Sequence, residues 1–132
     1  MKYKAHTVGS LVSACGLIYI SKRYEIEINP ISLLGGAIIG GLFPDIDHPK
    51  SLIGRSIIPI STIIFATVGH RTLTHSLLFA IIIGLLTSIF SLSAGIGISV
   101  GILSHIILDL LTPGTRGVAF LYPFNAKNIR LF

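Results

Sequence analysis

The sequence predicts an all-α membrane protein, a polytopic helical bundle with four spanning helices and one short re-entrant or interfacial helix. The 132-residue chain is 52% hydrophobic and only 11% charged, whereas soluble domains carry about 25% charged residues. Its mean hydropathy is +0.86, and its apolar residues fall into runs separated by short polar segments. At this length, residues 1–132 are expected to form a single integral-membrane domain.

The first two predicted helices cover residues 7–20 and residues 30–43. The first would reach only about 21 Å, short of the roughly 30 Å hydrocarbon core, unless its polar ends extend it. Asn29 and Pro30 are typical of the cap and the first position of the second helix.

Small residues in the second helix predict close packing. Gly36 and Gly40 lie four residues apart, so that another helix can approach the backbone there. We expect Gly9 and Ser13 of the first helix to provide the matching face.

The remaining apolar runs predict three more helices. Residues 57–69 are short and contain Pro59, which favours a re-entrant or interfacial helix. Residues 74–92 and 92–111 are long and apolar, and both are expected to span the membrane. The last helix is followed by a stop signal and by a segment typical of a membrane interface: Thr112-Pro113-Gly114 and Tyr122-Pro123-Phe124.

Charge then predicts the orientation. If four helices cross and the third segment returns, every polar cluster emerges on one face, and the other face carries only Lys22 and Arg23. By the positive-inside rule the crowded face is cytoplasmic, which places both termini on the cytoplasmic side of the inner membrane. The basic residues form no stripe or arm, so we expect the lipid bilayer as a partner and no specific nucleic acid. The crowded face would hold Lys2, Lys4, Lys50, Arg55, Arg71, Arg116, Lys127 and Arg130.

Histidines and aspartates gather at the ends of the apolar segments. Nitrogen and oxygen donors concentrated in this way are what a borderline or hard divalent metal requires. His105 and Asp109 lie four residues apart, so they project from one helix face and can bind one ion or share a proton. The clusters are His6, then Asp45, Asp47 and His48, then His70 and His75, then His105 and Asp109.

Each cluster also has a purely structural interpretation. Asp109 could be held by a neighbouring arginine such as Arg71. Asp45 and Asp47 could belong to an ordinary turn. Arg71 could be a charge that sets topology rather than a clamp for a phosphate or carboxylate.

Three sequence blocks resemble the signature blocks of the LexA-regulated, membrane-bound metal-dependent hydrolases, the YdjM-like family. That family is itself similar, distantly, to the zinc phospholipase C and single-strand nuclease superfamily, where histidines and acids four residues apart bind clustered zinc ions. The resemblance implies metal ligation by His6, Asp45, His75, His105 and Asp109, with His48, His70 and Asp47 as further ligands or supporting groups. The blocks are Leu42-Phe43-Pro44-Asp45-Ile46-Asp47-His48-Pro49, His70-Arg71-Thr72-Leu73-Thr74-His75-Ser76, and His105 with Asp109-Leu110-Leu111-Thr112-Pro113-Gly114.

The function expected from these observations is a membrane-embedded metal-dependent hydrolase. One or more divalent ions, with zinc favoured over manganese, would activate water and polarise a phosphoester, such as a phospholipid. Arg71 would steady the anionic substrate, and Asp47 would take the proton.

Three other classes remain open from sequence. A metal transporter would need polar residues through the bilayer, and the helices offer little beyond Ser10, Ser13 and Thr87. A haem protein could use paired histidines, but the accompanying carboxylates argue against it. In a non-catalytic membrane protein the clusters would only fix helix packing, and alanine at Asp109 would damage folding without releasing metal.

Overall fold

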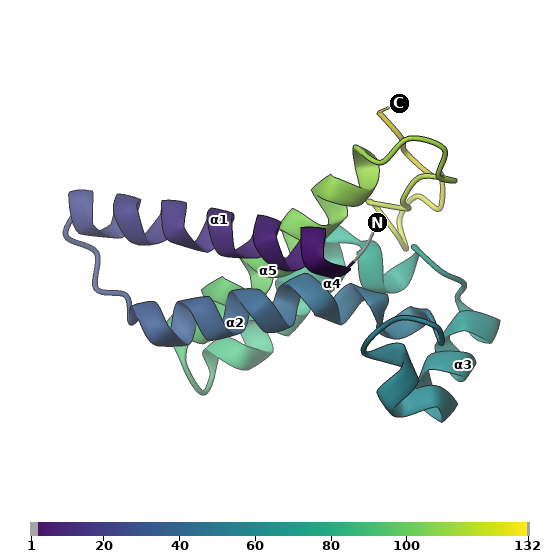
Figure 1. The fold of residues 1–132 in the computed structure, drawn as a ribbon, viewed down its shortest axis with the longest axis horizontal. Helices are drawn as coiled ribbons and strands as arrows, with labels where there is room; N and C mark the ends of the chain where they lie inside the picture. The colour runs from purple at the N-terminus through teal and green to yellow at the C-terminus, as the bar shows by residue number, and fades with distance from the viewer. Residues whose placement is uncertain (1–2, 132) are drawn as a thin grey trace.

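The computed structural model describes residues 3–131, which form five α helices and three 3-10 turns (Figure 1). The prediction of an all-α fold is confirmed, because the described residues contain no strand beyond one isolated bridge between Val118 and Ile129. Lys2, which the charge argument used, lies outside the described residues. The elements are α1 (Tyr3–Arg23), α2 (Pro30–Leu42), η1 (Phe43–Asp47), η2 (Gly54–Ile57), α3 (Ile58–Thr67), η3 (Leu73–His75), α4 (Leu77–Ser88) and α5 (Leu92–Leu110).

Polar caps determine where the helices begin. The side chain of Asn29 accepts a hydrogen bond from a backbone N–H in the first turn of α2, at 3.0 Å, and Pro30 follows as predicted. Ser76 caps α4 in the same way, at 3.1 Å. The expectation that this helix begins at residue 74 was therefore wrong: it begins at Leu77, and His75 lies in η3.

Helices α2 and α5 pack backbone against backbone. A Cβ on any of four glycines would collide with the backbone of the opposite helix, which is the geometry that small residues four apart permit. The contacts join Gly36 and Gly40 of α2 to Ala94 and Ile98, and Gly97 and Gly101 of α5 to Leu33 and Ala37.

The expected partner of the α2 glycines was wrong. Gly9 of α1 faces Leu108 and Ser104 of α5 rather than α2. The close contact between α1 and α2 is made by Ser10 against Gly41. Helix α5 is thus central, with α1, α2 and α4 all packed against it.

Helix lengths bear on the predicted spans. Among residues 3–131, α5 is the one helix both long and apolar enough to cross a membrane, and half of its apolar stretch is buried inside the protein. Helices α2 and α4 contain 13 and 12 residues, which gives lengths of about 20 and 18 Å against a core of roughly 30 Å. One candidate span is therefore found where four were predicted.

The helix ends that carry the histidines and acids meet at one end of the bundle. Figure 1 shows the start of α1, the end of α2, the start of α4 and the end of α5 together there, beside α3 and the C-terminal segment. The C-terminal segment is partly built into this end, since Val118 and Ala119 are fully buried and the Ala119 N–H donates to the carbonyl oxygen of Arg71 at 3.0 Å. No pattern in the sequence predicted this packing.

Candidate metal centre

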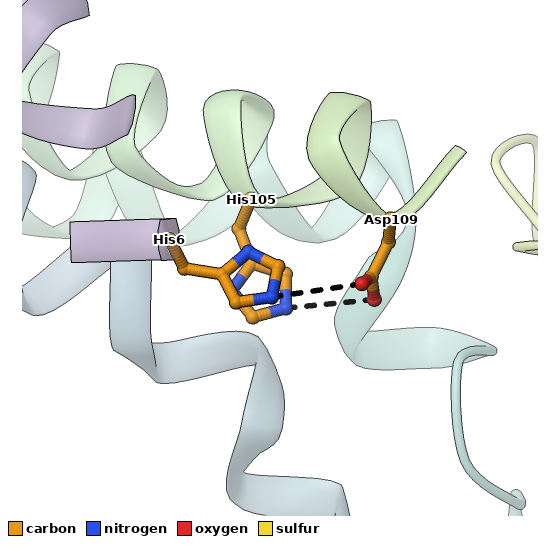
Figure 2. A group of neighbouring side chains, drawn as sticks. All are labelled: His6, His105 and Asp109. Carbon is orange, nitrogen blue, oxygen red and sulfur yellow. Dashed lines mark ion pairs between the residues drawn. The ribbon is translucent and has the colours of Figure 1, made fainter. Parts of the chain in front are cut away.

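Three buried side chains from two helices form the first half of the site (Figure 2). His6 lies in the first turns of α1, and His105 and Asp109 lie one turn apart near the end of α5. The two imidazole rings stack with their centroids 3.7 Å apart. Their Nε2 atoms lie 3.6 and 3.7 Å from the two carboxylate oxygens of Asp109. One ligand atom from each residue therefore falls within 4.8 Å of the others, a group that could hold a metal ion.

Two side chains from the turns complete the cluster. Asp45 of η1 places Oδ1 3.5 Å from Nε2 of His105, and His75 of η3 places Nε2 3.3 Å from Oδ2 of Asp109. Asp45, His75 and His105 form a second group that could hold a metal ion. Because both groups contain His105, the five residues form one continuous cluster.

Three buried ring nitrogens in this cluster lack hydrogen bonds, and the first is Nδ1 of His6. His75 and His105 are both fully buried, and Nε2 of each has no hydrogen-bond partner. Such a buried polar atom costs about 1–3 kcal/mol when it is left unsatisfied. Nδ1 of His105 lies 2.7 Å from the carbonyl oxygen of Gly41, which only accepts, so Nδ1 carries the proton and Nε2 presents its lone pair to the cluster.

The donor set and the distances fit zinc. Ligands held at about 2.0–2.1 Å in a tetrahedral arrangement lie about 3.3–3.4 Å apart. The nitrogen–oxygen separations in the cluster are 3.3–3.7 Å. Histidine and carboxylate ligands also suit manganese, so the residues present fit either ion.

Asp47 contacts the cluster through Nδ1 of His75, the ring nitrogen that does not face Asp109. It is fully buried and accepts hydrogen bonds from Nδ1 of His70 at 2.6 Å, the backbone N–H of Arg71 at 3.0 Å and the hydroxyl of Thr74 at 2.6 Å. Its Oδ2 also lies 3.3 Å from Nδ1 of His75. A carboxylate behind a ligating histidine fixes the orientation of the ring and raises its basicity.

These contacts shift two pKa values. Burial alone would raise the pKa of Asp47, but the hydrogen bond from His70 and the nearby ring of His75 hold it well below its usual range. Burial alone would lower the pKa of His75, but the carboxylates of Asp109 and Asp47 raise it to about 9. In the metal-free protein His75 is therefore a cation near neutral pH.

Arg71 connects Asp47 to Asp109, which belongs to the cluster. Its guanidinium donates to Oδ1 of Asp109 at 3.0 Å, which is the ion pair that the structural interpretation of Asp109 predicted. Its backbone adopts φ +64°, a conformation that a side chain disfavours. The N–H bond to Asp47 and the bond from Ala119 to its carbonyl oxygen hold the residue there.

His48 and His70 lie outside both groups of candidate ligands. Their rings are 4.9 Å apart, and they line a cavity of about 340 Å³ next to the cluster. Asp45 and Arg71 border the same cavity, so it opens directly on one candidate ligand.

Sequence reasoning missed four contributors to the site. Thr74 could have been suspected as a hydroxyl next to a candidate ligand, whereas the Gly41 carbonyl gives no signal in the sequence. Lys50 and Arg55 line the cavity, although the charge argument used them only to set topology.

Comparison with known proteins points to one family. A family model described as YdjM inner membrane protein matches residues 1–132. The uncharacterized protein YvsG of Bacillus subtilis is 34% identical over 93% of this chain and 74% of its own length. Two proteins of Escherichia coli, the inner membrane proteins YdjM and YbcI, are 41% and 31% identical over 74% and 75% of this chain. The chain spans 56% of that YdjM and 58% of YbcI. No solved structure matches it.

Proposed function

The chain belongs to the YdjM inner membrane protein family, and we propose that it is a metal-dependent hydrolase that cleaves a phosphoester at the cytoplasmic face of the inner membrane. The proposal extends to a distant relation with the zinc phospholipase C and single-strand nuclease superfamily, which the spacing of His105 and Asp109 on α5 supports. Regulation by LexA, which the sequence resemblance implies, stays a prediction.

One observation carries this proposal: five nitrogen and oxygen donors converge in a buried cluster in which Nε2 of His105 has no hydrogen-bond partner. A purely structural cluster would be expected to satisfy that atom internally. The residues that would hold the metal are His6, Asp45, His75, His105 and Asp109. When bound, zinc or manganese would make water more acidic and would polarise a phosphoryl oxygen.

Arg71 is the group that would steady the anionic substrate. It is 14% exposed and borders the cavity, so a phosphate in the cavity can reach it. Its bond to Asp109 fixes the guanidinium beside the candidate ligands. The ion pair between Arg71 and Asp109 is thus compatible with phosphate binding by Arg71 as well as with a structural role.

The proton-accepting role predicted for Asp47 fits His70 better. Asp47 is fully buried and its oxygens are already engaged. His70 is 27% exposed, lines the cavity and donates its Nδ1 proton to Asp47 at 2.6 Å. In this arrangement Asp47 orients the ring through Nδ1, while Nε2 of His70 exchanges protons.

The bond changes follow from this assignment. The oxygen of a water molecule bonds to phosphorus as the ester P–O bond breaks, and His70 takes the proton from the water and returns it to the leaving oxygen. The products are an alcohol and a phosphate.

The membrane placement in this proposal keeps α1, α2, α4 and α5 as spans and α3 at the interface. It is supported by the gathering of the polar helix ends at one end of the bundle (Figure 1), while Lys22 and Arg23 end α1 at the other. Four large side chains of α3 are about half exposed, as an interfacial helix requires: Ile58, Ile60, Ile63 and Phe65. The short α2 and α4 would need a locally thinned bilayer.

The test is hydrolysis by the detergent-purified protein loaded with zinc or manganese, measured as phosphate or alcohol released from a panel of phosphoesters. We expect metal-dependent turnover that falls at least a hundredfold in His105→Ala and persists in Lys22→Ala, a change at the far end of α1. Circular dichroism checks that each variant is folded. No turnover in any metal-loaded sample would contradict the proposal.

A further inference from the structure

The cavity beside the cluster is lined by more cationic side chains than acidic ones. Among the described residues that line it, Lys50, Arg55 and Arg71 are cationic, and Asp45 is the one acid. Asp45 is also a candidate metal ligand, so its charge would be engaged by the ion. The wall thus offers three positively charged side chains and one negatively charged side chain to a bound molecule.

Two of these cations have no ionic partner among the residues that the structure describes. Within residues 3–131 neither Lys50 nor Arg55 forms an ion pair, whereas Arg71 binds Asp109. Both side chains are exposed. A lysine and an arginine that line one cavity repel each other, and an anionic ligand relieves that repulsion.

The loop that bears these cations is tied to the candidate metal centre. The hydroxyl of Ser51 donates to the carbonyl oxygen of Asp45 at 2.6 Å and accepts the N–H of Gly54 at 2.8 Å. Nε of Arg55 donates to the carbonyl oxygen of Ser51 at 3.3 Å. A Cβ at Gly54 would collide with the carbonyl of His48, so the loop is also tightly packed. The positions of Lys50 and Arg55 are therefore set relative to Asp45.

The number of donors and the size of the cavity select among phosphoesters. A terminal phosphate has three unesterified oxygens and a charge of about −1.5 to −2 at neutral pH, and it can accept from several cations at once. A diester has two such oxygens and a single charge, and it needs room for two substituents. At about 340 Å³ the cavity lies at the small end of the range for ligand sites, roughly 300–1,000 Å³.

We propose that Lys50, Arg55 and Arg71 bind a terminal phosphate in this cavity and make the protein selective for phosphate monoesters over diesters. The inference rests on the proposed function, because it names the substrate class of the same site. Lys50 and Arg55 are its specificity-determining residues.

The monoester could come from a lipid or from solution, and both share the terminal phosphate. Leu52, on the cavity wall, is 43% exposed, and the exposed side chains of α3 follow it in the chain. A lipid tail could lie along this apolar surface while its phosphate enters the cavity.

The test measures binding separately from turnover. Phenyl phosphate and diphenyl phosphate are titrated calorimetrically into the detergent-purified protein, into Lys50→Ala and Arg55→Ala, and into the matched controls Lys22→Ala and Arg23→Ala at the far end of α1. We expect tighter binding of the monoester, which weakens about three- to tenfold in Lys50→Ala and in Arg55→Ala and is unchanged in the controls. Equal binding of both esters, or equal losses in test and control variants, would overturn the inference.

A competition experiment identifies the source of the phosphate. Mixed micelles containing phosphatidic acid, a monoester lipid, or phosphatidylglycerol, a diester lipid, are added to protein carrying phenyl phosphate. Displacement by phosphatidic acid alone supports a lipid monoester, and displacement by neither supports a soluble one. Equal displacement by both lipids would overturn selectivity.

Phenol release in the same samples separates the two proposals, because hydrolysis of either ester produces phenol. Selective binding of the monoester without turnover would support the phosphate site and contradict the hydrolase proposal. Turnover of both esters without selective binding would support the hydrolase proposal and contradict the selectivity for monoesters.

Discussion

Nδ1 of His105 lies 2.7 Å from the carbonyl oxygen of Gly41, across the interface between α5 and α2. This bond settles which nitrogen of His105 carries the proton, because a carbonyl oxygen only accepts. The lone pair on Nε2 is thereby directed into the cluster of acids and histidines. Helix packing and the candidate metal centre are therefore coupled through a single residue.

Asp47→Asn tests the support behind His75. The amide retains the size of the side chain but removes the negative charge that orients His75 and His70. Loss of such a carboxylate lowers metal affinity roughly 10- to 100-fold, and we expect a fall of this size in a chelator competition titration. Ser56→Ala, an exposed position away from the cluster, serves as the control. Equal affinity in Asp47→Asn and wild type would show that Asp47 is not a supporting group.

Metal affinity should depend on pH through His75. Because the pKa of His75 is raised to about 9 in the metal-free protein, metal must displace its proton at lower pH. The apparent affinity should fall about tenfold for each pH unit below about 9 and level off above it. Competition with a chelator, corrected for the chelator's own protonation, measures this slope. An affinity that stays constant between pH 7 and 9 would rule His75 out as a ligand.

Two glycines of α2 give a matched test of helix packing. A Cβ at Gly40 would collide with the backbone of Ile98 in α5, whereas a Cβ at Gly35 has nothing within 4 Å. We expect Gly40→Ala to lower the free energy of unfolding by about 1–3 kcal/mol, and Gly35→Ala to leave it unchanged or raise it. Thermal unfolding in detergent reports both. Equal stability of the two variants would contradict the packing of α2 on α5.

Cys15 tests the membrane placement without any new label. Its side chain is exposed on the protein surface, but in the proposed arrangement it lies in the middle of a span and faces lipid. A membrane-impermeant maleimide should therefore leave it unmodified in intact membranes. In a Cys15→Ser background, Lys22→Cys should react from outside the cell and Lys127→Cys only after the membrane is opened. Rapid labelling of Cys15 would contradict the span.

The sequence predicted the fold where local signals decide it. Asn29 and Pro30 indicated the start of α2, and the apolar run ending in Thr112-Pro113-Gly114 predicted α5 to within one residue at its C-terminal end. The start of α4 was misplaced because Ser76 competes with Thr74 as a cap, and only the turn around His75 decides between them.

Tertiary contacts explain what the sequence could not predict. Glycines four residues apart indicated that α2 has a close-packing face, but they carry no information on which helix covers it, and α5 rather than α1 does so. The site residues were named from their types and from the family resemblance. That Asp47 sits behind His70 and His75, while Asp45 faces His105, depends on the 3-10 geometry of η1, which the sequence pattern does not reveal.

The central claim, that the five-residue cluster binds a metal, is tested most directly by elemental analysis of the detergent-purified protein beside His105→Ala and His48→Ala. His48→Ala is the matched control, since His48 lies outside both groups of candidate ligands. The account predicts near-stoichiometric zinc or manganese in the wild type and in His48→Ala, and its loss in folded His105→Ala. A folded wild-type protein that holds no metal after reloading with zinc and manganese would contradict it, and the cluster would then serve only to pack the helix ends.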